Sequence, residues 1–142
     1  MSSIKDPGTP ILIVDDSVQY TQVLTKILKN VFGYTNITTV DETAEAYKLI
    51  SADPERFRMM FVDFRFPSGT TGGDLLTKLN EESLMIDKVA FLITSEPTVD
   101  NVKQASAAGA MGVVAKPFDR DQLKKQFERA IRLKDAEQEG SF

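Results

Sequence analysis

Three aspartates occupy positions from which they could bind one cation together. Asp15 and Asp16 directly follow the aliphatic run of ILIVDD, and Asp63 directly follows the apolar run MMFV. Carboxylates that share a cleft repel each other, and their pKa values rise unless positive charge compensates. Mg²⁺ is a hard divalent cation that takes octahedral oxygen ligands. The three carboxylates therefore predict a Mg²⁺ site if the fold brings the two segments together.

Two further side chains suit a phosphoryl group. Lys116 offers a compact positive charge for one phosphoryl oxygen, and the hydroxyl of Thr94 can donate a hydrogen bond to another. With a cation and a carboxylate nucleophile, these groups predict phosphoryl transfer to an aspartate, which attacks in line and forms an acyl phosphate.

The elements that must position these residues alternate along the chain. Short apolar runs rich in β-branched residues predict strands at 11–14, 37–40, 59–62, 89–93 and 112–115. Helical periodicity lies between them, as in QVLTKILKNVF, where Val23, Leu24, Ile27, Leu28 and Val31 predict one inner face. This alternation predicts a doubly wound α/β domain, (βα)5 and flavodoxin-like, with a parallel sheet in the order 2-1-3-4-5. In that order the first and third strands are neighbours, so the three aspartates would converge at the carboxyl edge of the sheet.

Length and composition limit the organisation and the chemistry. The 142 residues suit one domain, assigned to residues 10–134, with a loose segment at 1–9 and a polar tail at 135–142. The last helix is expected to start at a capping box of Asp119 and Gln122. There is no histidine for a Ser-His-Asp nucleophile or an imidazole zinc site. The net charge is −4 and no basic cluster is present, so we expect no direct nucleic-acid binding.

The sequence does not suggest secretion or membrane insertion. The chain has no cysteine, no secretory h-region and no apolar run long enough to cross a bilayer. A cytoplasmic protein that does not insert into a membrane is the expectation.

Four motifs in chain order resemble those of receiver domains of two-component response regulators. They are VDD at 14–16, VDFRFP at 62–67, ITS at 93–95 and AKPF at 115–118. The resemblance covers residues 10 to about 134. It implies a phosphorylatable signalling switch that catalyses its own phosphorylation from a phosphohistidine, supplied by a sensor histidine kinase or a histidine phosphotransfer protein. It also implies an unknown downstream protein partner.

The resemblance also implies roles for individual residues. Asp63 would be the phospho-acceptor and a metal ligand. Asp16 would bind Mg²⁺ directly, Asp15 would help through water, and the backbone carbonyl of Arg65 would be a further ligand. Thr94, Ser95 and Lys116 would lie at the phosphoryl group, and the Lys116–Pro117 peptide would be cis.

Three departures from the family pattern are specific to this chain. Val113 stands where receivers usually carry an aromatic switch residue, so we expect the signal to leave through backbone shifts at Thr94 and Ser95. Gly72 comes one residue later than the family's glycine, which predicts a mobile loop. Arg65 and Glu96 carry opposite charges on either side of the phosphoryl group. They are expected to pair across the mouth of the site, or Arg65 to turn inward to the phosphate, and so to limit the approach of water.

Other interpretations compete with these. Asp16 with Gln19 also forms a good capping box, Thr94 could bond its own turn, and Lys116 could be a solvated loop lysine. At the level of function, a pseudo-receiver that docks without phosphorylation is the main alternative. A flavodoxin-like FMN protein would need a Ser/Thr/Gly phosphate loop where the chain has DDSVQY, and an aspartate-nucleophile phosphatase would need a DxDx(T/V) motif that is absent.

Overall fold

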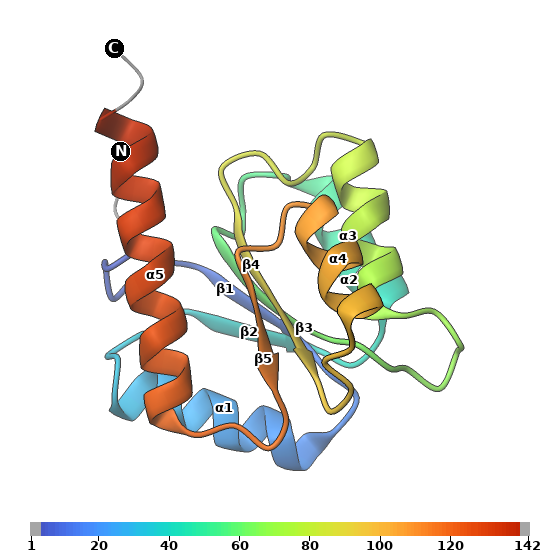
Figure 1. Ribbon diagram of the computed structural model, residues 1–142, viewed down its shortest axis with the longest axis horizontal. Coiled ribbons are helices and arrows are strands. Elements are labelled where there is room, and N and C mark those ends of the chain that lie inside the picture. Colours follow the sequence, from blue (N-terminus) through green and yellow to red (C-terminus); the bar gives the residue numbers. More distant parts are fainter. Residues whose placement is uncertain (1–3, 140–142) are drawn as a thin grey trace.

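The structure, a computed structural model, describes the backbone of residues 4–139 and the side chains of residues 4–134. Within the described residues, five strands alternate with five helices (Figure 1). The elements are β1 (Ile11–Val14), α1 (Val18–Asn30), β2 (Ile37–Val40), α2 (Thr43–Ala52), β3 (Met59–Asp63), α3 (Gly72–Glu81), β4 (Val89–Thr94), α4 (Val99–Ala107), β5 (Gly112–Ala115) and α5 (Arg120–Glu139). The strands agree with the predicted runs, except that β3 and β4 each extend one residue further.

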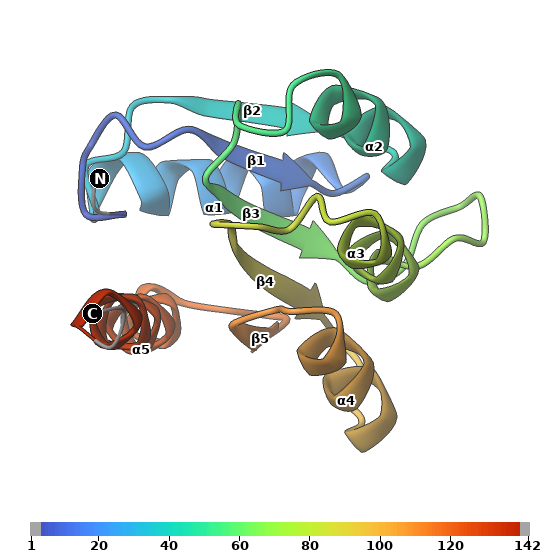
Figure 2. The same ribbon diagram turned by 90° about the horizontal axis from the view of Figure 1, so that it is seen from above.

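The five strands form one parallel sheet in the order β2-β1-β3-β4-β5, which confirms the predicted doubly wound fold. Figure 2 shows α1 and α5 on one face of the sheet and α2, α3 and α4 on the other. The crossover helices cover both faces, so the central strands are buried throughout.

Alternate residues of each strand enter two separate cores. Leu12 and Val14 face the α2–α3–α4 layer, where they meet side chains such as Leu76. Ile11 and Ile13 face the α1–α5 layer together with Phe127. The period-2 alternation of side chains along a strand produces this division.

On the α1–α5 face of the sheet, α1 buries a narrower stripe of residues than predicted. Leu24 and Leu28 of α1 are buried as predicted, but Val23 and the C-cap residue Val31 are 41% and 48% exposed, so the expected inner face was too wide. A helix that packs on one face of a sheet buries only the residues pointing directly at it. Asp119 caps α5 as predicted, since its Oδ1 accepts a hydrogen bond from the Gln122 N–H at 2.9 Å, which is one of the two bonds of the predicted capping box.

The chain on both sides of the expected domain carries structure. Ile4, in the segment expected to be loose, is 2% exposed, and its carbonyl accepts a 2.6 Å hydrogen bond from the Tyr34 hydroxyl. The backbone of 135–139, within the expected tail, continues α5. Residues 1–3 and 140–142 lie outside the described part. Within the described part, no helix combines the length and the apolar character needed to span a membrane.

Candidate functional site

The strand register brings the predicted site residues to one edge of the sheet. Val14 pairs with Val62, so Asp15 and Asp63 follow at the same level on neighbouring strands. Thr94 pairs with Ala115, so Lys116 follows one residue beyond Thr94 on the far side. In an open parallel sheet this carboxyl edge is where ligands bind.

The three aspartates form a cluster that fits a metal ion. Asp15, Asp16 and Asp63 each offer a carboxylate oxygen, and these oxygens lie within 4.8 Å of one another. Asp15 and Asp63 are buried, whereas Asp16 is exposed. Three oxygen donors with one side open to solvent match the way Mg²⁺ is usually bound, by a few carboxylates with water completing its shell.

Lys116 connects the two buried carboxylates. Its Nζ lies 3.1 Å from Asp15 Oδ2 and 3.0 Å from Asp63 Oδ1, and its side chain is only 8% exposed. The solvated loop lysine considered as an alternative is therefore wrong. The ammonium therefore offsets part of the negative charge of both buried carboxylates.

Asp63 has a strongly perturbed carboxyl group. Burial is the main cause and the charge of Asp15 adds to it, so that the pKa of Asp63 rises from 3.8 to about 6, even though Lys116 works in the opposite direction. A carboxylate that costs energy to keep ionised is expected where charge is to be neutralised by a ligand.

The start of α1 separates the roles of the adjacent aspartates. Asp15 Oδ1 accepts a 2.9 Å hydrogen bond from the Ser17 N–H, which turns the chain from β1 into α1. The N-cap is Ser17, whose Oγ accepts from the Tyr20 N–H at 3.4 Å. The alternative in which Asp16 caps this helix with Gln19 is therefore wrong, and the Asp16 carboxylate is free of that task.

Thr94 is 2% exposed, and its Oγ1 accepts a 2.9 Å hydrogen bond from the Glu96 N–H. The local turn bond considered in the sequence is thus present, but a hydroxyl that accepts one bond still has a proton to donate. Ser95 is exposed beside it. The Thr94 hydroxyl can serve the turn and a ligand at the same time.

Arg65 and Glu96 form the pair expected across the mouth of the site. The guanidinium donates two parallel hydrogen bonds, Nε to Oε1 at 2.6 Å and one terminal nitrogen to Oε2 at 2.7 Å. The bond raises the pKa of Arg65 and lowers that of Glu96. The Arg65 side chain also lies over the ring of Phe64, 5.5 Å from its centroid. Of the two expected arrangements, the structure has the pair and not the inward-turned arginine.

Comparisons with known proteins agree with this geometry. The sequence profile described as the response regulator receiver domain matches residues 11–128. The chain belongs to this family. It is 29% identical over 119 residues to the chemotaxis protein CheY of Pseudomonas aeruginosa, covering 84% of this chain and 93% of that protein. It is 26% identical over 129 residues to the two-component response regulator ORR3 of rice (Oryza sativa), covering 91% and 95%. The crystal structure of Vibrio cholerae CheY4 superimposes with a TM-score of 0.71 at 27% identity, covering 86% and 98%.

A steric constraint explains why residue 72, at the start of α3, is a glycine. A Cβ at Gly72 would lie 2.0 Å from the backbone oxygen of Asp63, and the Gly72 N–H donates a 2.7 Å hydrogen bond to the Phe64 carbonyl. The first residue of α3 therefore packs directly on the backbone of the predicted acceptor. The mobility of the preceding loop remains a prediction.

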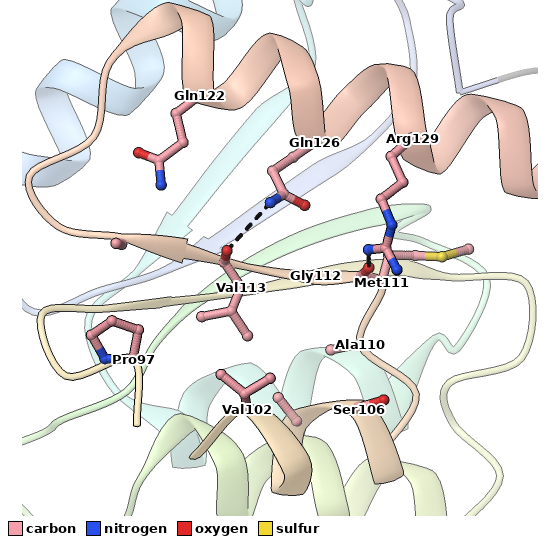
Figure 3. A pocket seen from close by; sticks show the side chains of 12 residues that line it. Pro97, Val102, Ser106, Ala110, Met111, Gly112, Val113, Gln122, Gln126 and Arg129 are labelled. Atoms are coloured by element: carbon pink, nitrogen blue, oxygen red, sulfur yellow. Dashed lines mark hydrogen bonds between the residues drawn. The ribbon is translucent and has the colours of Figure 1, made fainter. Parts of the chain in front are cut away.

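Val113 leaves space at the position of the usual aromatic switch. Figure 3 shows its side chain pointing from β5 toward Val102 of α4, in a cavity of about 360 Å³ whose other wall carries Gln126 and Arg129 of α5. Gln126 donates a 3.4 Å hydrogen bond to the Val113 carbonyl. A valine cannot fill this space in two alternative rotamers as an aromatic ring can.

Two features complete the surroundings of Lys116. The Lys116–Pro117 peptide is cis, as the resemblance implied. The ring of Tyr20 lies against the ammonium, with Nζ 4.1 Å from its centroid. Sequence reasoning missed Tyr20, and the only available signal was its position in the first turn of a helix that starts at the site.

Proposed function

We propose that this receiver is a phosphorylatable switch whose acceptor is Asp63. The observation that supports this best is a buried carboxylate with a raised pKa that lies 3.0 Å from a buried lysine, inside a three-aspartate cluster. A docking module without chemistry would not need buried carboxylates, which cost free energy. The phosphoryl donor would be a phosphohistidine on a sensor histidine kinase or a histidine phosphotransfer protein.

Each residue has a task in the transfer. An Asp63 oxygen attacks phosphorus in line as the bond from phosphorus to the histidine nitrogen breaks. Lys116 moves from the Asp63 carboxylate to a phosphoryl oxygen while it keeps Asp15, and Thr94 donates its proton to another oxygen. Asp15, Asp16 and Asp63, with the Arg65 carbonyl, would hold Mg²⁺, which supplies charge neutralisation when bound.

The signal would leave the site through Glu96. Its N–H is bonded to Thr94 Oγ1, and its carbonyl accepts 2.8 Å hydrogen bonds from the Thr98 N–H and from Asn101 Nδ2 in α4. If Thr94 moves toward a phosphoryl group, it carries this turn, and with it the start of α4. This route needs no aromatic residue at position 113 and suits the backbone shift expected from the sequence.

The direct test is phosphorylation by acetyl phosphate with Mg²⁺. We expect intact mass to increase by one phosphoryl group, hydroxylamine to remove it, and Asp63→Ala to abolish it. A parent protein that gains no phosphoryl group under these conditions contradicts the proposal and favours the phosphorylation-independent docking module.

The Arg65–Glu96 pair is expected to prolong the phosphorylated state. Because the pair joins the chain two residues beyond Asp63 to the chain two residues beyond Thr94, opening it should let water reach the phosphoryl group. Arg65→Met and Glu96→Ala should each shorten the phosphoryl half-life by about two- to fivefold, measured by loss of the added mass after the donor is removed.

Arg56→Met is the matched control for that measurement. Arg56 is also exposed and also lies over a neighbouring ring, that of Phe57 at 4.8 Å, but it is not among the residues of the site. Its half-life should equal that of the parent. Unchanged decay in both test variants would remove the gating role from the pair.

A further inference from the structure

Lys116 has three partners around its ammonium group, and one of them is an aromatic ring. Two partners are the carboxylates of Asp15 and Asp63, and the third is the face of Tyr20, 4.1 Å from Nζ to the centroid. The side chain of Lys116 is 8% exposed, so little water reaches the group. A cation over an aromatic face is attracted by the ring's quadrupole, and more strongly where water is excluded.

Tyr20 is held in this place from two directions. Its backbone N–H is bonded to the N-cap Ser17, which fixes the first turn of α1 next to Asp15 and Asp16. Its ring packs against Phe118, two residues after Lys116, with centroids 6.0 Å apart. The contact thus joins α1 to the loop that follows β5, across the carboxyl edge of the sheet.

The three partners of the ammonium differ in what phosphorylation does to them. Once Asp63 carries a phosphoryl group, its carboxylate is no longer free to pair with Lys116, and the lysine must exchange that contact for one with a phosphoryl oxygen. The ring face does not depend on the state of Asp63. A contact that is present before and after transfer can keep a flexible four-carbon side chain directed into the site while the charge it faces moves.

We propose that Tyr20 is a positioning residue for Lys116, acting through its ring face and not through its hydroxyl. This role rests on the proposed phosphorylation of Asp63. It predicts that the ring is required, whereas the phenolic oxygen is not.

The test compares Tyr20→Phe with Tyr20→Leu. Phenylalanine keeps the ring face, and leucine keeps a similar apolar bulk without it. With Mg²⁺ and acetyl phosphate, Tyr20→Leu should lower the rate constant for phosphorylation by about two- to thirtyfold, and Tyr20→Phe should stay within about twofold of the parent. The same leucine change in a Lys116→Met background should have no further effect, because Tyr20 acts through the lysine.

A spectroscopic measurement checks the contact without any phosphoryl transfer. The ε-methylene protons of Lys116, which the ring face should shield, are expected to resonate upfield in the parent and in Tyr20→Phe, and to lose this shift in Tyr20→Leu. Two results would overturn the role of Tyr20 and leave the proposed function standing. One is an equal phosphorylation rate for the leucine and phenylalanine variants, and the other is that Tyr20→Leu lowers the rate as much in the Lys116→Met background as in the parent. A parent that is never phosphorylated would overturn the proposed function, and this role with it.

Discussion

Asp63→Asn is expected to raise the free energy of unfolding of the metal-free protein by up to about 3 kcal/mol at pH 7.5. The pKa of Asp63 is about 6 in the folded protein, mainly because of burial and secondly because of Asp15, against 3.8 without these effects. An acid whose pKa is raised by folding destabilises the folded state wherever it is ionised there. Asparagine has a similar shape and carries no charge, so the cost disappears.

The pH dependence gives this prediction a definite sign. The cost of Asp63 is fully present above about pH 6, shrinks as the pH falls from about 6 toward 3.8, and is absent below that. In urea unfolding, the advantage of the asparagine variant over the parent should therefore fall by about half between pH 7.5 and pH 5. A difference in free energy of unfolding that does not change over this range would show that it does not come from the ionisation of Asp63.

Melting curves with added Mg²⁺ and a control variant, Asp16→Asn, complete the experiment. Millimolar Mg²⁺ should raise the melting temperature of the parent, because the ion binds the folded cluster. It should also narrow the gap to Asp63→Asn, which has lost one ligand. Asp16→Asn is the control. It should stabilise the metal-free protein in the same direction, but less, because Asp16 is exposed. A parent melting curve that Mg²⁺ leaves unmoved would mean that the metal site is wrong.

The sheet and the clustered aspartates could be predicted because local patterns determine them. Five apolar runs separated by helical periodicity leave few topologies, and strand order 2-1-3-4-5 alone places the end of β1 beside the end of β3. The side chains that follow, Asp15 and Asp63, then meet whatever their detailed conformations. Lys116 directly follows β5 and therefore reaches the same edge of the sheet.

Contacts that depend on side-chain direction could not be predicted in this way. Asp16 and Ser17 are adjacent and both are good N-cap residues, and only the hydrogen bond from the Tyr20 N–H to Ser17 Oγ shows which of them caps α1. Tyr20 meets Lys116 across 96 positions of sequence, through a rotamer and not through a pattern. The close backbone approach of Gly72 to Asp63 was likewise not visible in the sequence, which suggested only a mobile loop there.

Lys116→Met should have the opposite effect on stability and a comparable size. Removing the ammonium leaves two carboxylates, whose side chains are 2% and 11% exposed, without their shared cation. Losing one partner of a buried ion pair typically costs about 3–5 kcal/mol, so the metal-free protein should unfold more easily by roughly 3 kcal/mol. The exposed Lys124 of α5 is the control, and Lys124→Met should change stability by less than about 0.5 kcal/mol.

The two substitutions together test whether Lys116 and Asp63 act as one unit. Lys116 lowers the pKa of Asp63, so without it the carboxyl group costs more to ionise, and Asp63→Asn should stabilise the Lys116→Met protein by more than it stabilises the parent. Equal gains in both backgrounds would show that the two groups are not coupled.

Lys116→Met should also slow phosphorylation by about 10²- to 10³-fold, even with Mg²⁺. The variant lacks a donor to the developing phosphoryl charge, and a smaller fraction of Asp63 is ionised and able to attack. In the proposed transfer, the charge that makes the unmodified protein less stable than it could be is thus the charge that would react, and Lys116 would limit its cost until a phosphoryl group arrives.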